Sequence, residues 1–331
     1  MSTLAFLWHF LAIFIIASCA LPSLPSRIHD HRSSPSLPST IIHELPKGTW
    51  LENLVIRQTE GNALVTLLSS PRSCLGIVEL YHDIFNIVAG NFSVKAGSST
   101  PGSYSIWEID MRNRDAVTTK IADIPGSGFL NGMTVLDPVT GILLVADSLL
   151  SVVWSVNVRT GHVAVALNDT TMAPTTDGTI SLGINGLRVV DSNLYYDNSN
   201  KATFNRIPVD LHTGQATGPA VTLFQGSSAE ILPDDFAIDF EGNAWVVTGG
   251  QMFLLPGATG SQSIGMEFVA GSVTETRITG WTSTKFGTRQ ADVERGSVYV
   301  TTDGGPLAYR DGNFTAGGML VRIDTADLKL Y

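Results

Sequence analysis

Three residues with ligand-type side chains occupy equivalent positions in this 331-residue sequence. Asn131, Asn185 and Asp234 each open a short apolar run, and successive members are 54 and 49 residues apart. Amide and carboxylate oxygens are the ligands that hard cations such as calcium prefer, and they also accept hydrogen bonds. A fold that brings these positions to a common centre would build one oxygen-rich site from distant parts of the chain.

Each of the three residues begins the same short pattern, and a fourth copy follows them. The pattern is a polar residue, an apolar strand, a tight turn, and a second strand that ends in a small or acidic residue. The paired strands are residues 131–135 with 142–148, 185–190 with 194–198, 234–239 with 244–248, and 280–287 with 297–302. The fourth copy, counted at Thr282, follows Asp234 by 48 residues. A repeat of this length, made of short strands, predicts the four-stranded blades of a β-propeller.

Two further units precede these four. Residues 50–56 with 63–66 form a first blade, a less regular second blade contains residues 75–78, 84–89 and 105–109, and residues 319–323 supply the closing strand of the last blade. The sequence therefore predicts an all-β fold, a six-bladed β-propeller, in which closure removes open sheet edges. Only 79 residues separate Glu52 from Asn131, too few for two full blades. The first blade is therefore predicted to be truncated.

The N-terminal region differs in composition from the propeller. Residues 1–20 are interpreted as a signal peptide, because residues 4–16 are almost wholly apolar and small residues follow at Ser18 and Ala20. The apolar stretch is short for a stable membrane span. Residues 21–45 are rich in Pro and Ser and are predicted to be a disordered leader. Residues 46–331 are predicted to form a single propeller domain.

Charge and cysteine content narrow the classes of partner. The net charge is −10 and 15% of residues are charged, which disfavours nucleic-acid binding. Removal of Cys19 with the signal peptide leaves Cys74 without a partner, so no disulfide is expected. Three N-x-S/T sequons support passage through the secretory pathway, with a secreted or lumenal glycoprotein as the product; they are Asn91, Asn168 and Asn313. A monomer acting on a small molecule is expected.

The order of these motifs resembles that of SMP-30/gluconolactonase-like six-bladed propellers. The resemblance rests on the Asn-Gly-apolar runs at Asn131 and Asn185, the Pro-Asp and Gly-Asn-x-Trp-Val stretches over residues 233–247, and the Thr-Ser-x-x-Phe-Gly stretch from Thr282. It implies that a Glu, an Asn and an Asp at the starts of innermost strands bind one divalent cation, calcium or zinc. These ligands correspond to Glu52, Asn185 and Asp234, and the family's substrate-contacting Asn corresponds to Asn131. The implied activity is that of a metal-dependent lactonase.

Two departures from that family favour a different chemistry. The family's Glu-Gly-Pro start is replaced by Glu-Asn-Leu at Glu52, and its Pro-Asp-Gly motif is replaced by Pro-Asp-Asp. The additional aspartate, Asp235, is expected to face outward as a solvated loop residue rather than to join the site. The stretches at residues 51–53 and 129–133 are similar to those of fungal hetero-Diels–Alderases of tropolone–sesquiterpene pathways. That narrower resemblance implies a cofactor-free secondary-metabolite enzyme of meroterpenoid biosynthesis, which joins a tropolone quinone methide to a humulene-type sesquiterpene.

The cycloaddition hypothesis assigns a role to each candidate residue. Asp234 and Asn131 are the expected catalytic residues, while Asn131, Asn185, Trp50 and Trp281 are expected to contact the substrate at the mouth of the axial channel. Such a site must hold two apolar partners in reactive geometry and exclude water. A lactonase and a non-catalytic binding propeller remain the alternatives. Asn-Gly is also a common turn signal, so Asn131 and Asn185 have a purely structural alternative.

Overall fold

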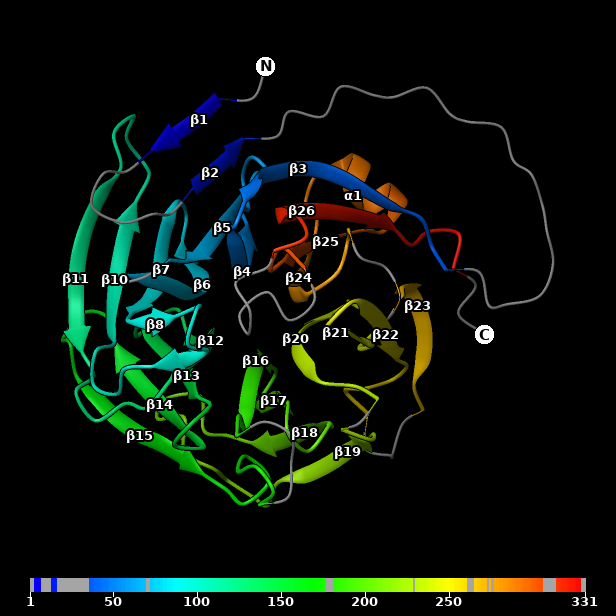
Figure 1. The fold of residues 1–331 in the computed structure, drawn as a ribbon. Helices are drawn as coiled ribbons and strands as arrows, with labels where there is room; N and C mark the ends of the chain where they lie inside the picture. Colours follow the sequence, from blue (N-terminus) through cyan, green and yellow to red (C-terminus); the bar gives the residue numbers. More distant parts are fainter. Residues whose placement is uncertain are drawn as a thin grey trace, which may run out of the picture.

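Antiparallel strands around a central axis make up most of the protein (Figure 1). The computed structural model describes residues 3–6, 13–16, 36–69, 72–176, 181–228, 230–260, 265–272, 274, 277–305 and 314–328. Within these ranges the helix is α1 (Gln290–Arg295), and no helix is long and apolar enough to cross a membrane. The all-β propeller expected from the sequence is therefore confirmed.

Six innermost strands surround the axis. They are β4 (Trp50–Ile56), β6 (Ser73–Tyr81), β12 (Leu130–Asp137), β16 (Ile184–Val190), β20 (Pro233–Ile238) and β24 (Trp281–Phe286). Each packs against the next one along the chain, and β24 packs against β4. The innermost strands therefore form a closed ring.

Five of these strands lead complete four-stranded blades. After β6 come β7 (Ile84–Gly90), β10 (Ser105–Asp110) and β11 (Val117–Asp123); after β12 come β13 (Ile142–Asp147), β14 (Val152–Asn157) and β15 (Val163–Asn168). After β16 come β17 (Asn193–Asn198), β18 (Thr203–Pro208) and β19 (Val221–Gln225); after β20 come β21 (Ala244–Thr248), β22 (Gln251–Leu255) and β23 (Glu267–Gly271). The blade of β24 contains β25 (Ser297–Thr302), β26 (Gly317–Asp324) and β3 (Ser39–Lys47).

The expectation of six blades is corrected to five, because the region expected to form the first blade supplies only two strands. β4 pairs with β5 (Ala63–Leu68), and the chain then passes directly to β6 of the next blade. The outer side of β5 pairs instead with β2 (Ile13–Ile16), which pairs with β1 (Thr3–Phe6). β1 and β2 lie in the stretch interpreted as a signal peptide, whose other residues lie outside the described ones.

The last blade is completed by a strand from the N-terminal side of the propeller. β3 pairs antiparallel with β26, with Ser39 opposite Ile323 and Lys47 opposite Gly317. The disordered leader was predicted to extend to residue 45, but the chain is already a strand from Ser39 onward, so that part of the prediction is wrong. These residues form backbone hydrogen bonds with the otherwise free edge of β26. Residues 21–35 of the predicted leader lie outside the described part of the chain.

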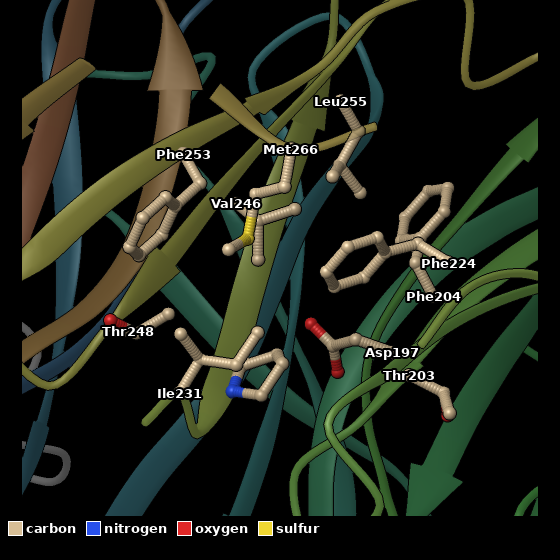
Figure 2. A pocket seen from close by; sticks show the side chains of 11 residues that line it. Asp197, Thr203, Phe204, Phe224, Ile231, Val246, Thr248, Phe253, Leu255 and Met266 are labelled. Carbon is tan, nitrogen blue, oxygen red and sulfur yellow. The ribbon is translucent and has the colours of Figure 1, made fainter. Parts of the chain in front are cut away.

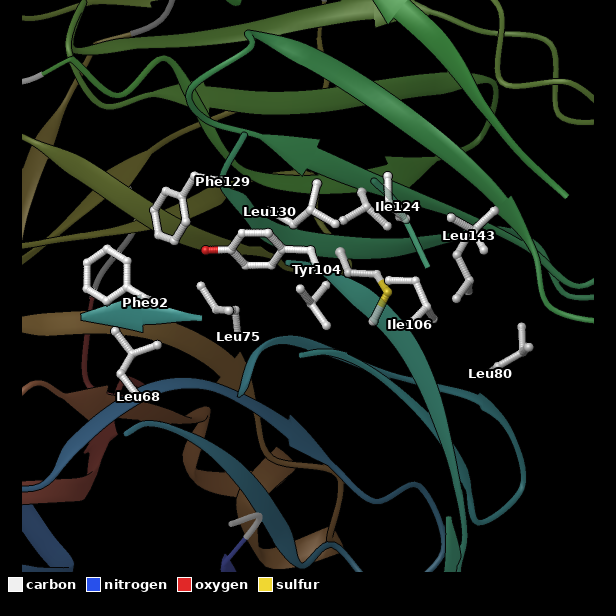
Figure 3. Close-up of a cluster of buried hydrophobic side chains, with 14 residues drawn as sticks. Leu68, Leu75, Leu80, Phe92, Tyr104, Ile106, Ile124, Phe129, Leu130 and Leu143 are labelled. Carbon is white, nitrogen blue, oxygen red and sulfur yellow. The ribbon is translucent and has the colours of Figure 1, made fainter. Parts of the chain in front are cut away.

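Apolar side chains fill the spaces between neighbouring blades. One such cluster surrounds Tyr104, with Leu75, Ile106, Leu130 and Leu143 packed near it (Figure 3). All five side chains are essentially inaccessible to solvent. Burial of side chains of this size contributes roughly 1.5–3 kcal/mol each, so these layers hold the blades, and the polar axis between them, in place.

Candidate functional site

A cavity of about 560 Å³ opens on the axis of the propeller. Its lining includes every residue expected to contact a substrate or a cation, namely Trp50, Glu52, Asn131, Asn185, Asp234 and Trp281. These residues come from β4, β12, β16, β20 and β24, which are spread over 232 residues of chain between Trp50 and Trp281 in sequence order. The predicted convergence of the repeated position on one site is therefore found in the structure, while the role of each residue stays a proposal.

The polar residues reach the axis because each innermost strand bulges at the same point. The register of β12 against β13 shifts between Leu130 and Met133, and that of β16 against β17 shifts between Ile184 and Leu187. Equivalent shifts occur at Leu51/Leu54, Pro233/Asp235 and Trp281/Ser283. Asn131, Asn185, Glu52 and Asp234 all fall inside these shifts. A bulge leaves residues unpaired and redirects their side chains, which explains why these positions face the cavity.

The glycines of the two Asn-Gly pairs serve close packing at the axis. A Cβ on Gly132 would lie 2.5 Å from the backbone oxygen of Asn185, and one on Gly186 would lie 2.6 Å from Oδ1 of Asp235. Both pairs lie within strands β12 and β16. The alternative interpretation of Asn131 and Asn185 as turn residues is therefore wrong, because the glycine is required by the neighbouring blade and not by a turn.

Glu52 is held by the indole of a neighbouring tryptophan. Trp50 Nε1 donates a hydrogen bond of 2.7 Å to Glu52 Oε2, and the glutamate is only 6% exposed. Burial raises the pKa of Glu52 to about 7, the hydrogen bond from Trp50 opposes this rise, and the nearby charges of Asp303 and Asp235 add to it. A carboxyl group in this state carries a proton for part of the time near neutral pH, and can then donate a hydrogen bond.

Asp234 is held in a similar way by Asn185. Asn185 Nδ2 donates to Asp234 Oδ1 at 2.6 Å and to Ser199 Oγ at 3.1 Å, while Ser199 Oγ donates to the backbone oxygen of Pro233 at 2.7 Å. Burial and the charge of Glu52 raise the pKa of Asp234 well above its ordinary value, against the effect of the Asn185 hydrogen bond. Asp234 therefore favours the protonated form.

The amide of Asn131 lines the cavity without a side-chain hydrogen bond to another described residue. Asn131 as a whole is 4% exposed. The polar atoms of this amide are not among the fully buried, unpartnered ones, so molecules in the cavity can reach them. Its position on the cavity wall makes a bound molecule the natural partner for this amide.

Asp303 is a cavity residue that the sequence analysis missed. It follows β25 directly, lines the cavity, and accepts a hydrogen bond of 2.9 Å from the backbone N–H of Gly305 through Oδ1. A Cβ on Gly280 would overlap the Asp303 carboxyl group, so the glycine makes room for it. Burial raises the pKa of Asp303 well above its ordinary value, and the charge of Asp234 adds to this rise. The rule that second strands end in an acidic residue could have identified it.

Asp235 is buried on the axis, so the expectation that it faces outward as a solvated residue is wrong. It is 2% exposed, receives two contacts of 2.9 Å from Arg188 Nη2, and lies 3.2 Å from Lys285 Nζ. Burial would raise the pKa of Asp235, but Arg188 and Lys285 lower it below the ordinary value. Burial and the charge of Arg188 lower the pKa of Lys285 to about 7. These charges form an ion cluster within the ring of innermost strands, beside Asp234.

A second pocket lies beside this ion cluster and is far smaller. Its volume is about 10 Å³, and phenylalanine and aliphatic side chains surround the carboxyl group of Asp197 there (Figure 2). Asp197 Oδ1 accepts a hydrogen bond of 2.9 Å from the backbone N–H of Gly186, which stabilises the bulge beside Asn185. This pocket has room for about one water molecule, so the axial cavity is the candidate site for an organic substrate.

The expected cation ligands do not fit an ion in this arrangement. Glu52 and Asp234 each accept an N–H, and Asn185 presents its amide nitrogen toward Asp234, whereas a metal ligand would present the carbonyl oxygen. Among the described residues, no group of three or more histidine, cysteine, aspartate and glutamate side chains could hold an ion, so a cation here would also need an amide oxygen such as that of Asn185. The donor set suits hydrogen bonding better than coordination.

Two curated proteins with the same type of name are similar in sequence to this chain. A protein from Sarocladium schorii named as a candidate hetero-Diels–Alderase, asR5, is 24% identical over 254 residues, which is 63% of this chain and 63% of that protein. A second candidate hetero-Diels–Alderase, from a Phoma species, is 24% identical over 292 residues, or 73% of this chain and 81% of its own length. The match thus spans less than two thirds of the first relative. No family profile matches the chain.

Solved structures share the architecture at low sequence identity. A calcium-binding protein, regucalcin from Agrobacterium tumefaciens, has a TM-score of 0.58 at 16% identity, covering 87% of this chain and 94% of its own. A protein named as a candidate gluconolactonase has a TM-score of 0.50 at 11% identity, covering 87% and 92%. These likenesses support the β-propeller fold, and the chain thus resembles both groups that its motifs indicated.

Proposed function

We propose that this protein is a secondary-metabolite enzyme of the hetero-Diels–Alderase type, which joins a tropolone quinone methide to a humulene-type sesquiterpene in meroterpenoid biosynthesis. The names of both curated relatives support an enzyme of this class. The observation that carries the proposal is the cavity itself. It combines the unpartnered amide of Asn131 and weakly acidic carboxyl groups with aromatic walls.

This reaction requires little covalent chemistry from the protein. The O=C–C=C unit of a quinone methide and the C=C bond of an alkene rearrange to a dihydropyran ring, with one new C–C bond and one new C–O bond. No group leaves, and no oxidant or reductant is consumed. Orientation of the two partners and stabilisation of charge that develops on the carbonyl oxygen are the remaining means of acceleration.

The polar residues of the cavity are suited to that carbonyl oxygen. In the proposed complex the Asn131 amide and the protonated Asp234 carboxyl group donate hydrogen bonds to it. Asn185 positions Asp234, and Trp50 positions Glu52. Because burial raises the pKa of both carboxyl groups, their protonated forms are favoured relative to exposed carboxyl groups, and a protonated carboxyl donates without placing a full negative charge next to the electron-rich oxygen.

The reaction also requires that water be excluded from the site, and the apolar walls of the cavity provide this. Trp281 is 1% exposed and Trp50 is partly buried, and both line the cavity beside the polar groups. A quinone methide reacts readily with water, so a site lined by indole and phenyl rings favours capture by the alkene. The volume of about 560 Å³ lies within the range of about 300–1,000 Å³ typical of small-molecule sites.

The test is conversion by the purified protein. A tropolone quinone methide generated in situ would be mixed with humulene, and the cyclised product would be followed by chromatography, with and without protein. Acceleration that is lost in Asn131→Leu supports the proposal. Conversion at the same rate and with the same stereochemistry as in buffer would refute it.

We also propose that the protein acts as a monomer in the secretory pathway. Asn91 and Asn168 lie in the described part of the chain, and Asn168 is exposed at the end of the outer strand β15. Asn313 lies outside the described residues. A shift in mass on treatment of the secreted protein with a glycosidase would test this assignment.

A further inference from the structure

We infer that the cavity has two chemically distinct halves, and that the hairpin of β8 (Phe92–Ser93) and β9 (Ser98–Ser99) binds the alkene partner, with Phe92 as the residue that determines specificity for it. This inference rests on the proposed function, because it assigns the two reactants of that reaction to different parts of the cavity wall. Each half is defined by residues that line the cavity.

The apolar half is a continuous hydrophobic wall. Phe92 stacks on Phe129 with ring centroids 5.0 Å apart, and Trp50 meets the edge of Phe92 at 6.5 Å. Leu68 and Leu182 pack in the same cluster. Figure 3 shows Leu68, Phe92 and Phe129 at one end of this cluster, while the aliphatic side chains extend away from them between the blades. This wall contains no ionisable side chain.

The hairpin is an addition to its blade. β7 ends at Gly90 and β10 begins at Ser105, whereas β13 and β14 are separated only by residues 148–151. Ser99 Oγ donates to the backbone oxygen of Gly128 at 2.7 Å and lies 2.8 Å from the hydroxyl of Tyr104. The hairpin is thereby tied to the next blade, and its serine hydroxyl is engaged by the protein.

The polar half adjoins the apolar half, since Trp50 and Glu52 both lie on β4. Glu52, Asp234 and Asp303 supply three carboxyl groups, and Asn131 and Asn185 supply two amides, from β4, β12, β16, β20 and the segment after β25. A hydrocarbon placed against this half would leave the Asn131 amide without a partner, which is unfavourable. A tropolone carbonyl oxygen can accept a hydrogen bond from that amide. The cavity therefore favours one orientation of the two reactants.

The rim of the cavity is consistent with an apolar ligand. Leu149 and Leu232 are 40% and 37% exposed while lining the cavity. In the proposed complex these two side chains would contact the hydrocarbon at the rim of the site. We therefore expect the alkene to bind without the tropolone fragment being present.

Binding of each fragment alone tests the inference, with humulene and tropolone as the probes. Equilibrium dialysis against humulene, quantified by gas chromatography, and against tropolone, quantified by absorbance, would be run on the unmodified protein, Phe92→Ala and Asn131→Leu. We expect Phe92→Ala to weaken humulene binding at least tenfold and to change tropolone binding less than twofold. Asn131→Leu is expected to show the reverse pattern.

Two further variants distinguish the loss of a ligand contact from a general loss of folded structure. Phe268→Ala removes a phenyl ring from β23, where it packs against Phe253 outside the cavity lining, and is expected to change neither affinity. Phe92→Leu keeps the wall apolar and is expected to lose less humulene affinity than Phe92→Ala. Equal loss of both ligands in Phe92→Ala, or no humulene binding by the unmodified protein, would overturn the inference. Selective binding without any acceleration of the reaction would instead refute the proposed function alone.

Discussion

The indole N–H of Trp50 donates to the carboxyl group of Glu52 over 2.7 Å, although the two residues are only two positions apart in β4. Glu52 falls within the bulge between Leu51 and Leu54, while Trp50 lies just before it. The pair joins the aromatic wall of the cavity to its acidic half. The protonation of Glu52 and the position of the Trp50 ring are therefore linked.

The first prediction concerns stability and pH. The pKa of Glu52 is raised from 4.5 to about 7, so the folded state binds this proton more tightly than the unfolded state does. The resulting stabilisation is present below pH 4.5 and is lost as the pH rises toward about 7; its full size is about 3 kcal/mol. Glu52→Gln should therefore reduce the fall in Tm between pH 5 and pH 8. Glu241→Gln, at an exposed position, is the control and should leave the fall unchanged.

The second prediction concerns Asn131 and turnover. Asn131→Leu should lower the rate of cycloaddition at least tenfold while the protein remains folded, because the lost amide has no partner within the described protein. Asn86→Leu is the matched control. Asn86 is fully buried on β7, both polar atoms of its side chain lack partners, and it does not line the cavity. That control should keep full activity and melt at an equal or higher temperature; equal losses of activity in the two variants would argue against a role for Asn131.

The third prediction concerns the buried ion cluster. Asp235→Asn leaves Arg188 and Lys285 without their shared carboxylate, and should destabilise the fold by about 3–5 kcal/mol. Asp110→Asn breaks an ion pair with Arg112 at the surface and should not change the stability measurably. Chemical denaturation of both variants would compare the two sites. A similar small effect in both would show that the axial cluster does not support the ring.

The fourth prediction concerns metal. The hydrogen bonds of Glu52 and Asp234 to N–H donors predict that treatment with EDTA, and later addition of calcium or zinc, leaves both Tm and turnover unchanged. Metal analysis of the purified protein would complete the experiment. One equivalent of bound cation, lost in Glu52→Gln, would favour the metal-dependent lactonase over the cycloaddition enzyme.

The sequence predicted the site better than it predicted the blades. The recurring polar residue before an apolar strand placed Asn131, Asn185 and Asp234 at one cavity, and the family resemblance added Glu52, because the same bulge occurs in every repeat; the roles of these residues stay predictions. Asp235 was misplaced for the same reason. Strict alternation along a strand would send it away from Asp234, but the bulge interrupts that alternation and Arg188 from the neighbouring blade draws it inward.

Other features depend on long-range contacts that bring distant parts of the chain together. Asp303 reaches the cavity only because the last blade brings the residue after β25 beside Gly280. The pairing of Ser39–Lys47 with Gly317–Asp324 joins segments from opposite ends of the chain, and the Pro- and Ser-rich stretch before it gives no indication of a strand. Such long-range pairings are decided by which edges remain free once the other blades have formed.

The pairing of β3 with β26 also fixes when the protein can finish folding. During synthesis β3 emerges early, but its partner strand emerges only after some 270 further residues have been made, since Gly317 lies 270 positions after Lys47. Until then the earlier blades can assemble only as an open arc with an exposed edge at each end. Closure is therefore a late, single event, and the nearly complete chain must stay soluble until it occurs. A chain truncated before Gly317 would form an open arc that is prone to aggregation.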